Sequence, residues 1–132
     1  MPKQLRTEIK KEAEVVDYIK KVWCEIVELC SLIKFYQIIA KDEKRNDAGG
    51  WCGVRYEPTT FQTDIYIYKD IFTEEMPKEG LTKGFKSFIK QGLCHEAGHI
   101  YIWELEGGKT HIEKTASQIG MLTFEILENR DI

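Results

Sequence analysis

Three residues of one short motif have the types and the spacing of a metal-dependent hydrolase. The motif is H-E-x-x-H, formed by His95, Glu96 and His99. On an α-helix, residues four apart lie about 40° apart around the axis, so the two imidazoles project side by side and can hold one Zn²⁺. Glu96 can then reach a water on that metal without ligating it. Zinc lowers the pKa of such a water, and the carboxylate can take its proton and later pass it to a leaving amine.

The motif could also be a pair of surface histidines that binds no metal. With three histidines and sixteen glutamates in the chain, shuffling would produce the motif in roughly half a percent of trials, so chance alone is a poor account. The same helical pattern contains Gly92 and Gly98, each of which costs about 1 kcal/mol relative to alanine. Glycines there are expected if another segment or a substrate backbone comes close.

A catalytic zinc usually has three protein ligands and one open position, so a third ligand should lie downstream. Ile102 and Leu105 stand where an extended metzincin signature requires glycine and histidine, which excludes that class. Four candidates remain: His111, Glu113, Glu125 and Glu128.

The elements that must position these residues follow from apolar periodicity. A helical period covers the first third of the chain, where Ile19, Ile26 and Ile33 form one row of a heptad pattern. Short β-rich runs follow at 35–40, 51–57 and 63–71. In the last run isoleucines alternate with tyrosines, which is typical of a half-buried strand.

The helical period returns from Leu81, runs through the motif and stops at the glycines of 106–109, and a final helical pattern covers 112–127. The order predicts an α+β fold in a single domain, 1–132. Its parts are a long N-terminal helix, a small three-stranded, mainly antiparallel sheet, an active-site helix and a C-terminal helix.

Composition narrows the location and the partners. The formal net charge is −3, which gives no general attraction to nucleic acid. No apolar run reaches the ~18 residues that a membrane span needs, and no secretory signal begins the chain, so we expect a cytoplasmic protein that contacts neither membrane nor nucleic acid.

The four cysteines form no C-x-x-C pair and are expected to be reduced and mostly buried: Cys24, Cys30, Cys52 and Cys94. Cys94 adjoins His95, but neighbours on a helix diverge by about 100°, which disfavours it as a ligand.

The stretch "HEAGHIYIWE", followed by a short connection and "EKTASQIGML", resembles the gluzincin metallopeptidases. In detail it is similar to the ImmA/IrrE-type enzymes and the single-domain minigluzincins, whose downstream helix reads roughly E-x-x-A-(N/D/S)-x-(F/I)-(A/G)-x-x-L. The positions that match are Glu113, Ala116, Ser117, Ile119 and Gly120. The resemblance covers about residues 60 to 125, although thirteen residues between His99 and Glu113 make a tighter connection than gluzincins usually have.

This resemblance implies a zincin-like fold in which the last helix is the glutamate helix. It implies Zn²⁺ as cofactor, held by His95, His99 and Glu113, with Glu96 as the catalytic base and acid. The activity implied is that of a small zinc metallopeptidase acting on a peptide or protein substrate. Such enzymes bind substrate in extended form along an edge strand, a role that the strand carrying Tyr66 and Tyr68 matches.

Several alternatives stay open. Thr110 and Glu113 also form a capping box, which would give Glu113 a purely structural role. His111 would be the third ligand in an SprT-like protease; otherwise it is a neighbour of the site. Ser117, one turn after Glu113, can orient a ligand or face solvent. Any of three tyrosines could supply an oxyanion donor, although Tyr101 lies about 120° from His95 and is expected to face away; the other two are Tyr66 and Tyr68.

The alternative function is a non-catalytic or latent module of the same fold that binds a regulatory protein partner. ImmA/IrrE-type domains are associated with repressor regulation, so this reading rests on the resemblance.

Overall fold

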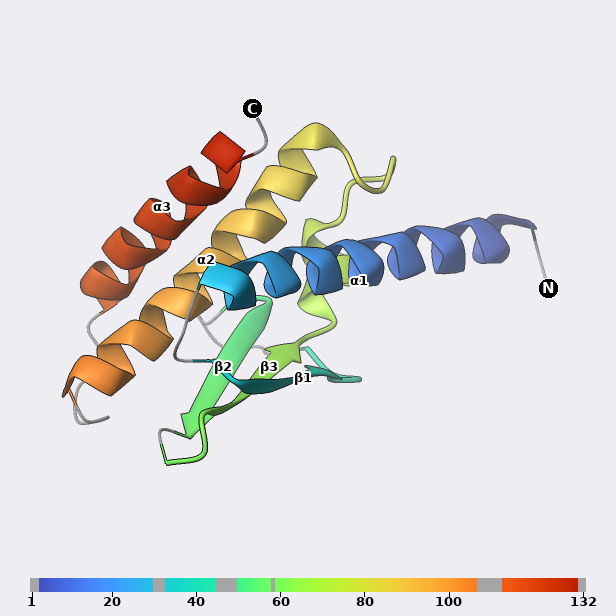
Figure 1. Cartoon of the computed structure of the whole chain (residues 1–132). Helices are drawn as coiled ribbons and strands as arrows, with labels where there is room; N and C mark the ends of the chain where they lie inside the picture. Colours follow the sequence, from blue (N-terminus) through green and yellow to red (C-terminus); the bar gives the residue numbers. More distant parts are fainter. Residues whose placement is uncertain (1–2, 30–32, 45–49, 58, 107–112, 131–132) are drawn as a thin grey trace.

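The computed structural model describes residues 3–29, 33–44, 50–57, 59–106 and 113–130. The elements follow the predicted order and confirm the α+β class (Figure 1): α1 (Lys3–Leu29), β1 (Phe35–Ala40), β2 (Cys52–Glu57), β3 (Gln62–Ile67), a π-helical turn η1 (Ile71–Glu75), α2 (Lys83–Glu106) and α3 (Glu113–Arg130). None of the helices in these ranges is both long and apolar enough to cross a membrane.

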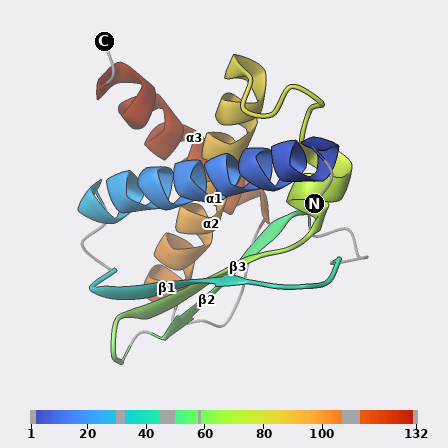
Figure 2. The same ribbon diagram turned by 90° about the vertical axis from the view of Figure 1, so that its right-hand side faces the viewer.

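The long helix α1 contributes one apolar face to the core. Ile19, Trp23 and Ile26 are buried there, and Figure 2 shows the helix running across α2 above the sheet. Ile9, near the start of the same helix, is 47% exposed, and Figure 1 shows the first turns of α1 extending beyond α2. From Val15 onward, α1 therefore contributes buried side chains to the core.

The sheet is mixed, and the prediction that it is mainly antiparallel is wrong. Its strand order is β1-β3-β2. A short turn makes β2 and β3 an antiparallel hairpin, while β1 pairs with β3 in parallel. β3 therefore lies between the two earlier strands, antiparallel to β2 and parallel to β1.

The position of β3 also corrects the expectation that this strand is a sheet edge. Every residue from Gln62 to Ile67 has a partner on both β1 and β2. The alternation itself is confirmed, since Ile65 and Ile67 are buried and Tyr66 is half-buried. A peptide cannot add to a strand whose two edges are already paired. In the described sheet the edge strands are β1 and β2.

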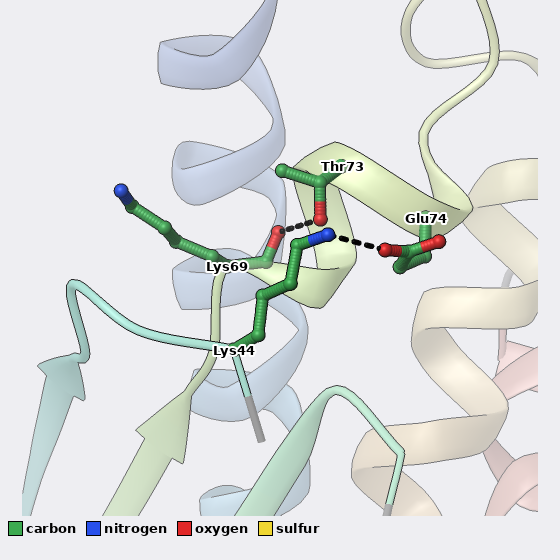
Figure 3. A network of polar contacts seen from close by, with 4 residues as sticks. All are labelled: Lys44, Lys69, Thr73 and Glu74. Carbon is green, nitrogen blue, oxygen red and sulfur yellow. Dashed lines mark hydrogen bonds and ion pairs between the residues drawn. The ribbon is translucent and has the colours of Figure 1, made fainter. Parts of the chain in front are cut away.

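Polar contacts join the segment between β3 and α2 to residues 41–44, which follow β1 (Figure 3). Lys44 Nζ donates to Glu74 Oε1 at 2.6 Å, and Thr73 Oγ1 donates to the Lys69 carbonyl oxygen at 3.2 Å. The Lys69 amide in turn donates to the carbonyl oxygen of Glu43 at 3.0 Å. These bonds help to fix the path by which the chain leaves the sheet for α2.

Candidate metal centre

The two histidines of the motif lie side by side on α2, as their spacing predicts. His95 Nε2 and His99 Nε2 are 3.1 Å apart, and the ring planes stand at 87° with centroids 4.7 Å apart. A carboxylate oxygen of Glu96 completes a group whose potential ligand atoms all lie within 4.8 Å of one another. Glu96 and His99 are only 7% and 9% exposed. The structure thus brings together three groups that could hold a metal ion, two of them buried and one, His95, half-buried.

The distance between the imidazoles fits a zinc ion. Two Zn–N bonds of about 2.0–2.1 Å at a tetrahedral angle separate their nitrogen atoms by about 3.3–3.4 Å. The observed 3.1 Å separation of the Nε2 atoms is within a few tenths of an ångström of that value. Neutral imidazole is also a donor that zinc favours, so this group can hold the metal ion with little rearrangement.

Ser117 of α3 contacts the outer nitrogen of His95. Its Oγ lies 3.2 Å from His95 Nδ1, and the residue is also exposed to solvent, so features of both alternatives considered from sequence are present. With a hydrogen on Nδ1, His95 donates to this hydroxyl and turns its Nε2 lone pair toward His99. Histidines that bind metals usually have their second nitrogen held in this way.

Glycines let α3 approach α2 closely enough for that contact. A Cβ added at Gly98 would overlap the carbonyl oxygen of Ala116, and one at Gly120 would lie 2.8 Å from the Cα of His95. Both obstacles are backbone atoms, which cannot rotate away. The expectation that small residues in this helix mark a close neighbour is confirmed at Gly98, where the neighbour is α3.

The opposite side of the site is formed by β2 and the residue before it. Cys52 Sγ donates to Glu96 Oε1 at 3.8 Å and also approaches the Gly92 carbonyl oxygen. The Trp51 ring packs where a Cβ of Gly92 would be, within 2.7 Å. The sequence did not identify Cys52 and Trp51 as neighbours of the motif; the signal it offered was Gly92, which suggested that another segment comes close.

Cys94 does not belong to the metal-binding group. Its side chain is fully buried, and burial raises the pKa of its thiol to about 12, with a smaller increase from the carboxylate of Glu128 that the charge of Lys90 opposes. It therefore stays a protonated thiol within the hydrophobic core.

The tyrosines have packing roles. Tyr101 is half-buried and packs against the core. Tyr66 lies under the Lys41 ammonium group, which is 5.1 Å from its ring centroid, and Tyr68 is half-buried.

Two of the four candidates for a third metal ligand, His111 and Glu113, have no described side chain. Glu113 is the first residue of α3, but its side chain is not among those described, and Thr110 and His111 lie in the segment 107–112, outside the described ranges. Of the other candidates, Glu128 pairs with Lys90 at 3.1 Å. Glu125 lies on α3, exposed to solvent.

A pocket of about 300 Å³ opens beside the metal-binding group. His95 and Ser117 contribute polar groups to its lining, and Met121 and Phe124 of α3 contribute apolar side chains.

Comparisons of the chain with protein-family models, with curated proteins and with solved structures find no match.

Proposed function

We propose that the protein is a small zinc-dependent metallopeptidase of the gluzincin type, which hydrolyses peptide bonds. One observation supports this most strongly: two Nε2 atoms, on His95 and His99, converge to 3.1 Å beside the buried carboxylate of Glu96. Two imidazoles that can hold a zinc ion and a carboxylate that can take a proton from a metal-bound water are the groups that this hydrolysis requires.

The proposed ligands are His95, His99 and Glu113. The helices α2 and α3 are antiparallel neighbours, since Gly98 contacts Ala116 while Gly120 contacts His95. Ser117 is level with His95. One turn earlier on α3 is Glu113 and one turn later on α2 is His99, so these two residues fall at the same level on facing helices.

In the proposed reaction Glu96 moves the proton. When bound, zinc would polarise the scissile carbonyl and lower the pKa of a water. The Glu96 carboxylate accepts the proton of the attacking water and delivers it to the leaving amine. Cys52 Sγ, which donates to Glu96 Oε1 at 3.8 Å, orients this carboxylate from β2. Burial of Glu96 limits the solvent that would compete for the proton.

A substrate peptide cannot add along β3, the strand of Tyr66, because β3 is already paired on both sides. Of the two edge strands in the described sheet, β2 packs on α2 and carries Cys52 beside Glu96. We therefore place an extended peptide along β2, where main-chain hydrogen bonds would align it with the metal-binding group. The pocket lined by Met121 and Phe124 would receive an apolar side chain of that peptide.

The test is cleavage of a denatured protein and of a random peptide mixture by zinc-loaded wild type, Glu96→Gln and Glu125→Gln, followed by mass spectrometry. Glu125 is an exposed glutamate of α3 and serves as the matched control. Glu96→Gln should lower the rate by about 10²–10⁴-fold and retain zinc, while the control cleaves normally. Wild-type rates in Glu96→Gln would refute the mechanism.

The second candidate, a non-catalytic or latent module that binds a partner protein, is favoured by a different observation. The outer face of α3 exposes three apolar side chains, Met121 at 64%, Leu122 at 61% and Ile126 at 50%. Clustered exposed apolar groups often mark protein contacts. If the zinc-loaded protein cleaves nothing but forms a stoichiometric complex that Leu122→Asp abolishes, this function replaces the peptidase.

A further inference from the structure

A second concave site lies on the other side of α2 from the histidines. This pocket, of about 340 Å³, is enclosed by α1, α2 and the end of α3. Lys86 lines it, and because Lys86 and His95 are nine residues apart on one helix, they point about 180° away from each other. The site is therefore separate from the candidate metal centre.

Four lysines line this site, which we call the lysine pocket: Lys21 from α1, and Lys83, Lys86 and Lys90 from α2. Lys90 is buried and its Nζ pairs with Glu128 Oε1 at 3.1 Å. Within the described part of the chain, Lys21, Lys83 and Lys86 make no ion pair with a carboxylate. The Nζ of Lys86 is placed instead over the Tyr18 ring, 5.7 Å from its centroid.

The charge of the pocket opposes that of the whole chain. Its four lysines and two glutamates, Glu25 and Glu128, leave a formal charge of +2, whereas the chain carries −3. Like charges around one cavity repel, and a bound anion would relieve that repulsion. A phosphate monoester carries about −1.5 to −2 at neutral pH, which matches the local charge.

We propose that the lysine pocket binds a small molecule through a phosphate monoester group. The ammonium groups of Lys21, Lys83 and Lys86 contact the phosphate oxygens, and the half-buried Ser87 hydroxyl supplies a neutral donor. The ring of Tyr18 lines the space left for the rest of the molecule. The volume lies within the range of about 300–1,000 Å³ that small-molecule sites occupy.

The test is titration calorimetry with inorganic phosphate, adenosine monophosphate, glucose 6-phosphate and adenosine at constant ionic strength. The variants are Lys86→Gln, Lys21→Gln, Glu25→Gln and, as matched control, Lys20→Gln, which removes the same charge from an exposed neighbour outside the pocket. We expect saturable binding of all three phosphates, weakened about tenfold or more in Lys86→Gln and Lys21→Gln. Glu25→Gln should bind more tightly and Lys20→Gln as wild type.

Comparing inorganic phosphate with the two esters shows whether the phosphate group alone or the attached molecule determines the affinity. Either result supports the proposed phosphate site, provided that Lys86→Gln and Lys21→Gln weaken the binding. The proposal is overturned by three results: no saturable binding of any phosphate, equal affinities in Lys86→Gln and Lys20→Gln, or adenosine binding as tightly as its monophosphate. Saturable binding of an acidic peptide with none of the phosphates would also overturn it, in favour of a protein partner.

Discussion

Replacing Gly98 by alanine tests how closely α3 packs against α2. The new Cβ would overlap the Ala116 carbonyl oxygen and lie 3.0 Å from its carbonyl carbon. Alanine in a helix interior gains about 1 kcal/mol over glycine, but overpacking costs about 1–3 kcal/mol. Because the obstacle is backbone, α3 itself must move and the cost should fall at the upper end. We expect a net loss of about 1–2 kcal/mol in the free energy of unfolding.

The assay is urea unfolding followed by circular dichroism, in the presence of EDTA so that no metal contributes. Gly84→Ala is the matched control, because it lies in the same helix and an added Cβ there meets no atom within 4 Å. That control should be stabilised by up to about 1 kcal/mol. If Gly98→Ala unfolds at the same urea concentration as wild type or higher, the close packing of α2 and α3 is refuted.

Two further predictions follow from the surroundings of the site. Ser117→Ala removes the hydroxyl 3.2 Å from His95 Nδ1, so zinc affinity measured against a competing chelator should fall about 10–100-fold; an unchanged affinity would contradict the orienting role. Cys94 is fully buried with a thiol pKa of about 12, whereas Cys24 is exposed. Peptide mapping after iodoacetamide treatment at pH 8 should find Cys24 modified and Cys94 protected in the folded protein, and equal modification would disprove that burial.

The part of the site that lies on one helix could be predicted from sequence. A spacing of four residues fixes the angle between His95 and His99 once the segment is helical, and the observed pair agrees. The glycines added a useful signal, since Gly98 is where α3 comes close. The element order was predictable for the same reason, because each element has its own local period.

What sequence could not supply depends on contacts between distant segments. Alternation in the strand of Ile65 shows that one face is buried but not which strands lie beside it, so the central position of β3 was missed. Cys52 reaches Glu96 across 44 positions of the chain, and no local pattern encodes that pairing. Ile126 fits the apolar pattern of the last helix, yet it is 50% exposed because α3 packs on α2 with one side only.

The central claim is that α2 and α3 together hold one zinc ion, and metal analysis of purified protein tests it directly. Plasma mass spectrometry should find about one zinc per folded chain in wild type and loss of that zinc in His95→Ala, His99→Ala and Glu113→Ala. His111→Ala, which changes a histidine that the proposed site does not use, should keep the metal. No zinc in wild type, or equal zinc in His99→Ala, would contradict the account. Loss in His111→Ala but not in Glu113→Ala would replace the gluzincin ligand set with an SprT-like one.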